Sequence, residues 1–336
     1  MTTAAAPRSA RVGVWLVWAV SAELLLLRMG TRTAVHIPGL SAIAGPLTVV
    51  STAAKIAFTA AVVLALALLL LSMLETWQRG PLAKTAAVAV AVFLGGATAT
   101  ALGASVLVLD IVTLVAVVVV APFAVGDRPR GRALWWWAAV VVVLVAAIPG
   151  LTEAAGTAGL GSVRPTWLAG PVELVAVVVA LASPLLTGTT SSRRAAIVAV
   201  VTAAIVGAAF AFGPSTTEIL VLWNFGLSGF LPAALYGLAA GCVAHTIVRL
   251  TEEGRGTEAA AVFLVIAGGV GLQSTYQSAL MLCGLCLAGF AAVSEHRFTP
   301  RGEEGVTSAR TGMPVEEAAV EDPPAGAVAG SVKTPS

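Results

Sequence analysis

The sequence predicts an all-α fold, a polytopic integral membrane bundle of about ten transmembrane helices with both termini in the cytoplasm. Three observations predict this fold. Only 11% of the 336 residues are charged and 58% are hydrophobic, whereas about a quarter of the residues in a soluble domain are charged. Apolar stretches long enough to cross a bilayer, about 20 residues each, recur along the chain. The basic residues between these stretches collect in alternate loops.

Three regions follow from this pattern: a short cytoplasmic N-terminus over residues 1–11, a single transmembrane domain over 12–298, and a cytoplasmic tail over 299–336. The tail is rich in Pro, Gly, Ala and Glu and cannot bury a core, so we predict that it is disordered. The predicted spans are residues 12–30, 53–74, 85–102, 104–125, 133–150, 168–187, 195–212, 217–249, 258–272 and 275–294.

The first span has two interpretations. Arg8 and Arg11 precede an apolar run that ends near a small-residue sequence, Val20-Ser21-Ala22, as in a cleaved signal peptide. The run resumes after Glu23, however, and then has the length of a membrane span. We therefore predict a helix that is retained.

Two apolar stretches are about twice the length of one crossing, and we predict that each folds into a hairpin. The first covers residues 85–125 and turns near Gly103, and the second covers 258–294 and turns around 271–274. Residues 39–52 are apolar but interrupted by Pro46 and too short to cross. We expect them to lie along the outer interface or to dip into the bundle.

The span over 217–249 is too long for a simple crossing and contains Asn224, Gly226 and Gly229 near its middle. This interruption predicts either a broken helix at a substrate site, or an ordinary kinked helix, or a short interfacial helix that leads into a normal span from about Gly229. Small residues then recur every four positions and predict close approach of another helix. This ladder consists of Ala233, Gly237 and Gly241, and His245 continues it.

The basic residues orient the bundle. With the N-terminus inside, 15 of the 19 Lys and Arg residues fall on the cytoplasmic side, including those at 128–132, 193–194 and 249–255. Arg28, Arg32, Lys55 and Arg164 alone fall outside. Tryptophans at 135–137 follow the loop at 128–132, where an aromatic belt at headgroup level is expected.

Ionisable residues at membrane depth are costly, which makes them candidate functional residues. On this topology four acids lie in the outer half of the membrane, together with a basic stripe of Arg28, Arg32 and His36. The polar sequence around Gln273 lies at the outer turn of the last hairpin. The acids are Glu23, Asp110, Glu173 and Glu218. With Arg28, Asn224 and Gln273 they form the predicted substrate- or ion-binding set; the alternative is that they pair with one another and fix helix packing.

Other residues carry weaker expectations. His36 with two carboxylates could ligate a divalent metal, and His245 could relay protons or ligate haem, although a packing role fits each as well. Cys283 and Cys286 form a C-x-x-C sequence in apolar surroundings, which indicates packing and not redox chemistry. We expect no resident cofactor. No basic patch with interleaved aromatic residues occurs, so we expect no nucleic-acid partner.

These observations favour a secondary transporter or permease for a small polar or ionic solute, with its carboxylates as proton or cation sites. Two alternatives remain: a membrane-embedded metal- or haem-dependent enzyme or redox subunit, and a scaffold that assembles with a partner membrane subunit or with itself. Lysine is scarce while Ala, Val, Gly and Arg abound, which is typical of high-GC bacterial genomes. The expected location is therefore a bacterial plasma membrane.

Overall fold

A computed structural model describes residues 8–22, 44–75, 81–103, 105–157, 166–187, 192–212, 230–269 and 275–295. All of them lie in the first of the chain's two units, Met1–His296, and none in Arg297–Ser336. The described residues form ten α-helices and one 3-10 helix and contain no strand. The predicted all-α class is therefore confirmed.

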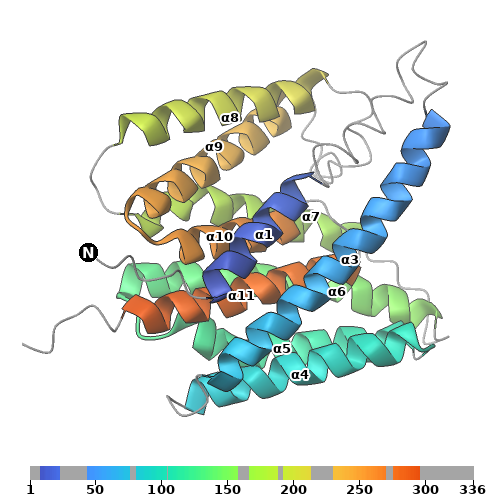
Figure 1. The fold of residues 1–336 in the computed structure, drawn as a ribbon. Coiled ribbons are helices and arrows are strands. Elements are labelled where there is room, and N and C mark those ends of the chain that lie inside the picture. The colour runs from blue at the N-terminus through green and yellow to red at the C-terminus, as the bar shows by residue number, and fades with distance from the viewer. Residues whose placement is uncertain are drawn as a thin grey trace, which may run out of the picture. The chain divides into compact units, whose positions relative to one another are not determined.

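The helices follow one another along the whole of this unit (Figure 1). Their bounds are α1 Arg8–Ala22, α3 Ala44–Glu75, α4 Pro81–Ala101, α5 Val106–Val125, α6 Arg130–Thr157, α7 Thr166–Leu181, η4 Ser183–Leu186, α8 Arg193–Phe212, α9 Phe230–Glu252, α10 Gly256–Gly269 and α11 Thr275–Glu295.

The long apolar stretch over 85–125 divides into α4 and α5, which pack against each other. The turn between them lies at Gly103, whose φ of +103° is one that glycine adopts readily and side-chain-bearing residues avoid. Ser105 then caps α5, because its side-chain oxygen accepts a hydrogen bond from the backbone N–H of Leu107 at 3.3 Å. The second long stretch likewise divides into α10 and α11, which also pack together.

Helix α11 is buried on every side over most of its length. Leu282, Cys283, Leu285 and Cys286 are all fully inaccessible, and α10, α5, α3, α1 and α6 pack around the helix. Neighbouring residues of a helix point in different directions, so the burial of all four means that this part of α11 has no exposed stripe. A helix without an exposed stripe is expected at the centre of a bundle. The two cysteines are thus apolar packing residues, and both are free thiols.

Helices α8 and α9 approach each other through the predicted ladder of small residues. A Cβ atom at Gly237 would lie 2.7 Å from the carbonyl oxygen of Ala203, and one at Gly241 would lie 2.9 Å from that of Ala199. These distances leave no room for a side chain at either glycine. The ladder therefore does bring two backbones together, as the spacing predicted.

A larger residue at Gly237 should separate α8 from α9. We expect Gly237→Val to lower the thermal stability of the purified protein by about 1–3 kcal/mol of overpacking, and to expose α8 to limited proteolysis. The control is Ala234→Val, since Ala234 is on the same helix but exposed. Equal stability of the two variants would show that the close approach is not needed.

Three elements differ from the predicted spans. Helix α3 starts at Ala44, so the expectation that residues 39–52 lie apart from the next span is wrong from Ala44 onward. Pro46 is compatible with this helix because it lies in the first turn, where no N–H partner is lost. Helix α6 runs past Pro149 to Thr157, beyond the predicted end at residue 150. Helix α7 ends at Leu181, before the predicted end at residue 187, and the 3-10 helix η4 follows from Ser183. Residues 217–229 of the long span lie outside the described residues.

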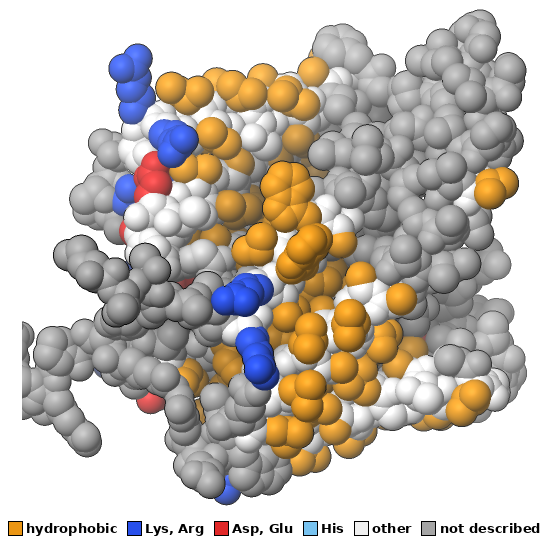
Figure 2. All heavy atoms as spheres, in the orientation of Figure 1, with side chains coloured by type: hydrophobic (Ala, Val, Ile, Leu, Met, Phe, Trp, Pro, Cys, Tyr) orange, Lys and Arg blue, Asp and Glu red, His pale blue; other side chains and the backbone are white. Residues whose placement is uncertain are grey.

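The described residues include three helices long and apolar enough to cross a membrane, Pro81–Thr100, Leu107–Val125 and Ala233–Glu252. Shorter apolar helices lie over Ala60–Leu74, Gly256–Ala267 and Ala279–Val293. Large apolar side chains are exposed on several helices, among them Trp15 at 76% and Val200 at 69%. Figure 2 shows hydrophobic side chains over much of the visible described surface, with basic and acidic groups gathered toward its left side. This surface fits a membrane protein, because lipid replaces water around it.

Candidate functional site

Most of the predicted binding residues fall outside the described part of the chain. This applies to Glu23, Arg28, Glu218, Asn224 and Gln273. It applies equally to the weak metal candidate His36 and to the basic-stripe residue Arg32. Glu173 lies in helix α7, but its side chain is not among those described.

Asp110 is the predicted site residue whose side chain the structure describes. It lies in the second turn of α5, is half-buried, and has one carboxylate oxygen, Oδ2, inaccessible. The rest of the helix is strongly apolar up to its end at Val125. Because a helix rises 1.5 Å per residue, Asp110 lies roughly 22 Å along α5 from that end.

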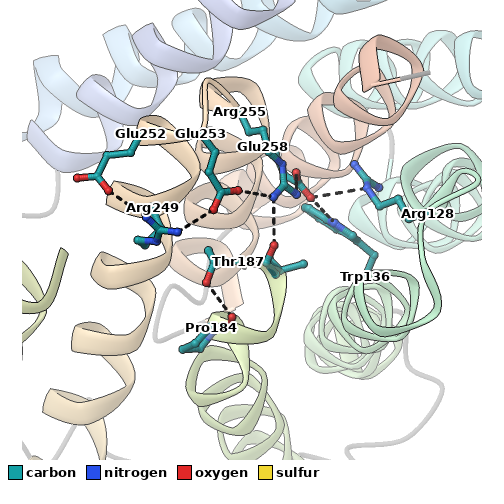
Figure 3. A network of polar contacts seen from close by, with 10 residues as sticks. Arg128, Trp136, Pro184, Thr187, Arg249, Glu252, Glu253, Arg255 and Glu258 are labelled. Atoms are coloured by element: carbon teal, nitrogen blue, oxygen red, sulfur yellow. Dashed lines mark hydrogen bonds and ion pairs between the residues drawn. The ribbon is translucent and has the colours of Figure 1, made fainter. Parts of the chain in front are cut away.

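A second group of ionisable residues lies at the opposite end of α5. We call it the charge network: Arg128, Arg249, Glu252, Glu253, Arg255 and Glu258, joined by ion pairs (Figure 3). Three arginines face three glutamates, so the formal charges balance. The network comes from the loop between α5 and α6 and from the end of α9, the start of α10 and the loop between them.

Glu258 is the centre of this network and is completely inaccessible to solvent. It lies in the first turn of α10, where the helix dipole stabilises a negative charge. Its Oε1 atom lies 3.6 Å from the Nε of Arg128 and accepts a hydrogen bond from the indole Nε1 of Trp136 at 3.1 Å. Its Oε2 atom accepts a hydrogen bond from Arg255. The buried carboxylate thus has partners on both oxygens.

Arg128 connects four helices although it precedes α6 by only two positions. Its guanidinium donates to the carbonyl oxygens of Ala124 and Val125 at the end of α5, the latter at 3.2 Å, and to Ala288 of α11 at 2.6 Å. A cation at the end of a helix satisfies its last carbonyls and interacts favourably with its dipole. The guanidinium also lies over the ring of Trp136, 5.1 Å from its centroid.

The rest of the network connects α9, α10 and η4. Arg255 donates to the carbonyl oxygen of Leu186 in η4 at 3.1 Å and to Glu253 at 3.0 Å. Arg249 pairs with Glu253 at 3.2 Å and with Glu252 at 3.4 Å. Ser192, next to the start of α8, donates to Glu252 at 3.0 Å. Glu252 and Glu253 are partly exposed. The network is therefore fully buried at Glu258 and reaches the surface at these two residues.

The expectation that all three tryptophans at 135–137 form an aromatic belt is wrong for two of them. Trp136 is fully buried, and Trp135 is 3% exposed and donates its indole N–H to the carbonyl oxygen of Val179 at 3.0 Å. Of the three, Trp137 is exposed, at 47%. The cause is the helical period: successive residues point about 100° apart, so three neighbours cannot all face lipid.

His245 lies on α9 with its Nδ1 atom buried and without a hydrogen-bond partner in the described part of the chain. Next to it, Thr246 donates a hydrogen bond to Ser183 of η4 at 3.1 Å, and both of these side chains are inaccessible. Within the described ranges, no group of three or more His, Cys, Asp and Glu residues is placed to hold a metal ion. Thr246 and Ser183 therefore form a polar contact between α9 and η4.

The sequence assigns Arg128, Arg249 and Arg255 to the cytoplasmic side, where they served only as topology markers. The alternation of basic and acidic residues over 249–258 was a signal that could have been used, because charges three or four positions apart pair on a helix. Nothing local in the sequence pairs Arg128 with Glu258, which is 130 positions further along the chain.

The comparisons with known proteins add no information: no protein-family model, no curated protein and no solved structure matches this chain.

Proposed function

We propose that this protein is a multi-pass secondary transporter or permease of a bacterial plasma membrane, which moves a small polar or ionic solute. The observation that carries the proposal is Asp110, a carboxylate within an otherwise apolar helix that is long enough to cross a bilayer. An ionisable group at this depth costs free energy, which makes it a candidate proton or cation site by default.

The proposed topology has ten spans with both termini in the cytoplasm. The charge network supports placing two loops on the same side, those holding Arg128 and Arg255, and the distribution of basic residues favours the cytoplasm as that side. Asp110 then lies toward the outer end of α5. Glu23, Glu173 and Glu218 are proposed to lie in the same outer half and to form the solute site with Arg28, Asn224 and Gln273.

The test is a flux assay in proteoliposomes. A panel of small ions, amino acids and sugars is offered with and without an imposed proton gradient, first to the unchanged protein. We expect at least one solute to move, and Asp110→Asn to abolish most of its flux, because the amide can neither carry a proton as a carboxylic acid does nor neutralise a cation. Asn keeps the shape of Asp and removes its charge.

The control is Asp127→Asn, since Asp127 is exposed in the loop after α5. We expect this variant to retain full flux. If no solute moves in any condition, or if Asp110→Asn transports as well as the unchanged protein, the proposed function is wrong. An absorption spectrum and metal analysis of the same preparation address the rival enzyme, which requires bound haem or metal.

A further inference from the structure

Five side-chain hydrogen bonds join separate elements near the charge network. They connect the α5–α6 loop with α11, α6 with α7 and α10, α9 with η4, and the α9–α10 loop with η4. The pairs are Arg128–Ala288, Trp135–Val179, Trp136–Glu258, Thr246–Ser183 and Arg255–Leu186.

Elsewhere among the described residues, two of the closest contacts between helices are made by small and apolar groups. Gly237 packs on Ala203, and a Cβ at Gly284 of α11 would lie 2.7 Å from Val265 of α10. Such contacts have no required direction, so the helices can shift past each other by small amounts. The hydrogen bonds and ion pairs, in contrast, have one geometry and hold one arrangement.

The composition of the network is not the one that stability alone would favour. Taking charges out of water is costly, and apolar residues of similar size often give equal or greater stability than a buried ion pair. A contact between charged groups differs from an apolar contact in the free energy that separating it costs. When it opens, water solvates the separated charges and offsets much of the lost attraction.

We propose that Arg128, Trp136, Arg255 and Glu258 form a latch that closes the cytoplasmic end of the bundle and that opens during the transport cycle. The role of the latch in transport rests on the proposed function. The contacts that form the latch are observed in the structure and do not depend on that function. Glu258 is the residue on which both arginines and the tryptophan converge (Figure 3). Removing the charge of Glu258 should therefore weaken its contacts with Arg128 and with Arg255 at the same time.

The chain contains its own reporters of opening. Cys286 and Cys283 are fully buried in α11, and Cys286 lies within one turn of Ala288, which Arg128 binds. Cys242 is partly exposed and is replaced by alanine in every sample. The purified full-length protein is treated with a small methanethiosulfonate reagent, and the labelling rate of the two remaining thiols is followed by mass spectrometry.

We expect Glu258→Gln to increase the labelling rate about tenfold, since labelling of a buried group follows the population of the open state. Glu252→Gln is the matched control: Glu252 belongs to the same network but is partly exposed and does not contact Glu258. It should leave the rate unchanged. Wild-type labelling of a folded Glu258→Gln protein would overturn the latch.

If Glu258→Gln does not fold, Arg255→Gln provides the test. It leaves Arg128 on its carbonyl acceptors and beside Glu258, and it removes the cation that joins Glu258 to Glu253 and to the carbonyl oxygen of Leu186. We expect labelling faster than in the unchanged protein, because one of the two cations beside Glu258 is lost. An unchanged rate would overturn the latch.

The two proposals fail separately, because labelling requires no solute. Faster labelling of Glu258→Gln without flux of any solute would support the latch and end the transporter proposal. Flux that depends on Asp110, with labelling insensitive to Glu258, would leave the transporter and overturn the latch.

Discussion

Replacing Arg128 with alanine is expected to destabilise the protein by about 3–5 kcal/mol, the range measured when one partner of a buried charge pair is removed. The substitution leaves Glu258 with a buried negative charge and one fewer cation beside it. It also frees the last carbonyl groups of α5 and the carbonyl of Ala288, which lose their donor. Unsatisfied buried acceptors add to the cost of the lost pair.

The matched control is Arg130→Ala. Arg130 lies two positions further along, at the start of α6, and its side chain is exposed. We expect a change within about 0.5 kcal/mol there, as for most surface substitutions. Thermal unfolding of both variants in the same detergent measures the difference. Equal midpoints for Arg128→Ala and Arg130→Ala would mean that the buried contacts of Arg128 contribute nothing.

The helices of this protein could be predicted because lipid solvent leaves a strong signal in the sequence. A hydrophobic run of fixed length marks α4 and α5, and Gly103 marks the turn between them. The ladder at Gly237 and Gly241 likewise fixed a helix contact, because small residues at a spacing of four have one geometric consequence. These features depend on neighbours within a few turns of each other.

The charge network could not be predicted in the same way. Whether Arg128 snorkels to the headgroups or turns inward depends on what lies opposite, and that is Glu258 on a distant segment. Trp136 shows the same limit. A tryptophan beside a basic loop fits a membrane interface as well as it fits a buried donor, and only the carboxylate next to its indole decides between them. The sequence predicts one side of a membrane for these residues, but not that they meet.

The second large effect is expected where α11 crosses α5. A Cβ atom at Gly289 would lie 2.2 Å from two ring atoms of Phe123, and Phe123 is 3% exposed. The ring also packs edge-on against Phe290, with centroids 5.7 Å apart, so it has little space to move. We expect Gly289→Ala to cost about 2–3 kcal/mol, in the range for overpacking a filled core, although alanine is the better helix former.

Gly95→Ala is the control that isolates this clash. Gly95 also lies inside a helix, α4, but no described residue comes within 4 Å of the Cβ that alanine would add. The same chemical change should therefore stabilise the protein there, by up to about 1 kcal/mol of helix propensity. Thermal unfolding should move in opposite directions for the two variants. A stabilised Gly289→Ala protein would mean that Phe123 leaves its position at little cost, and that α5 and α11 are not held together by this contact.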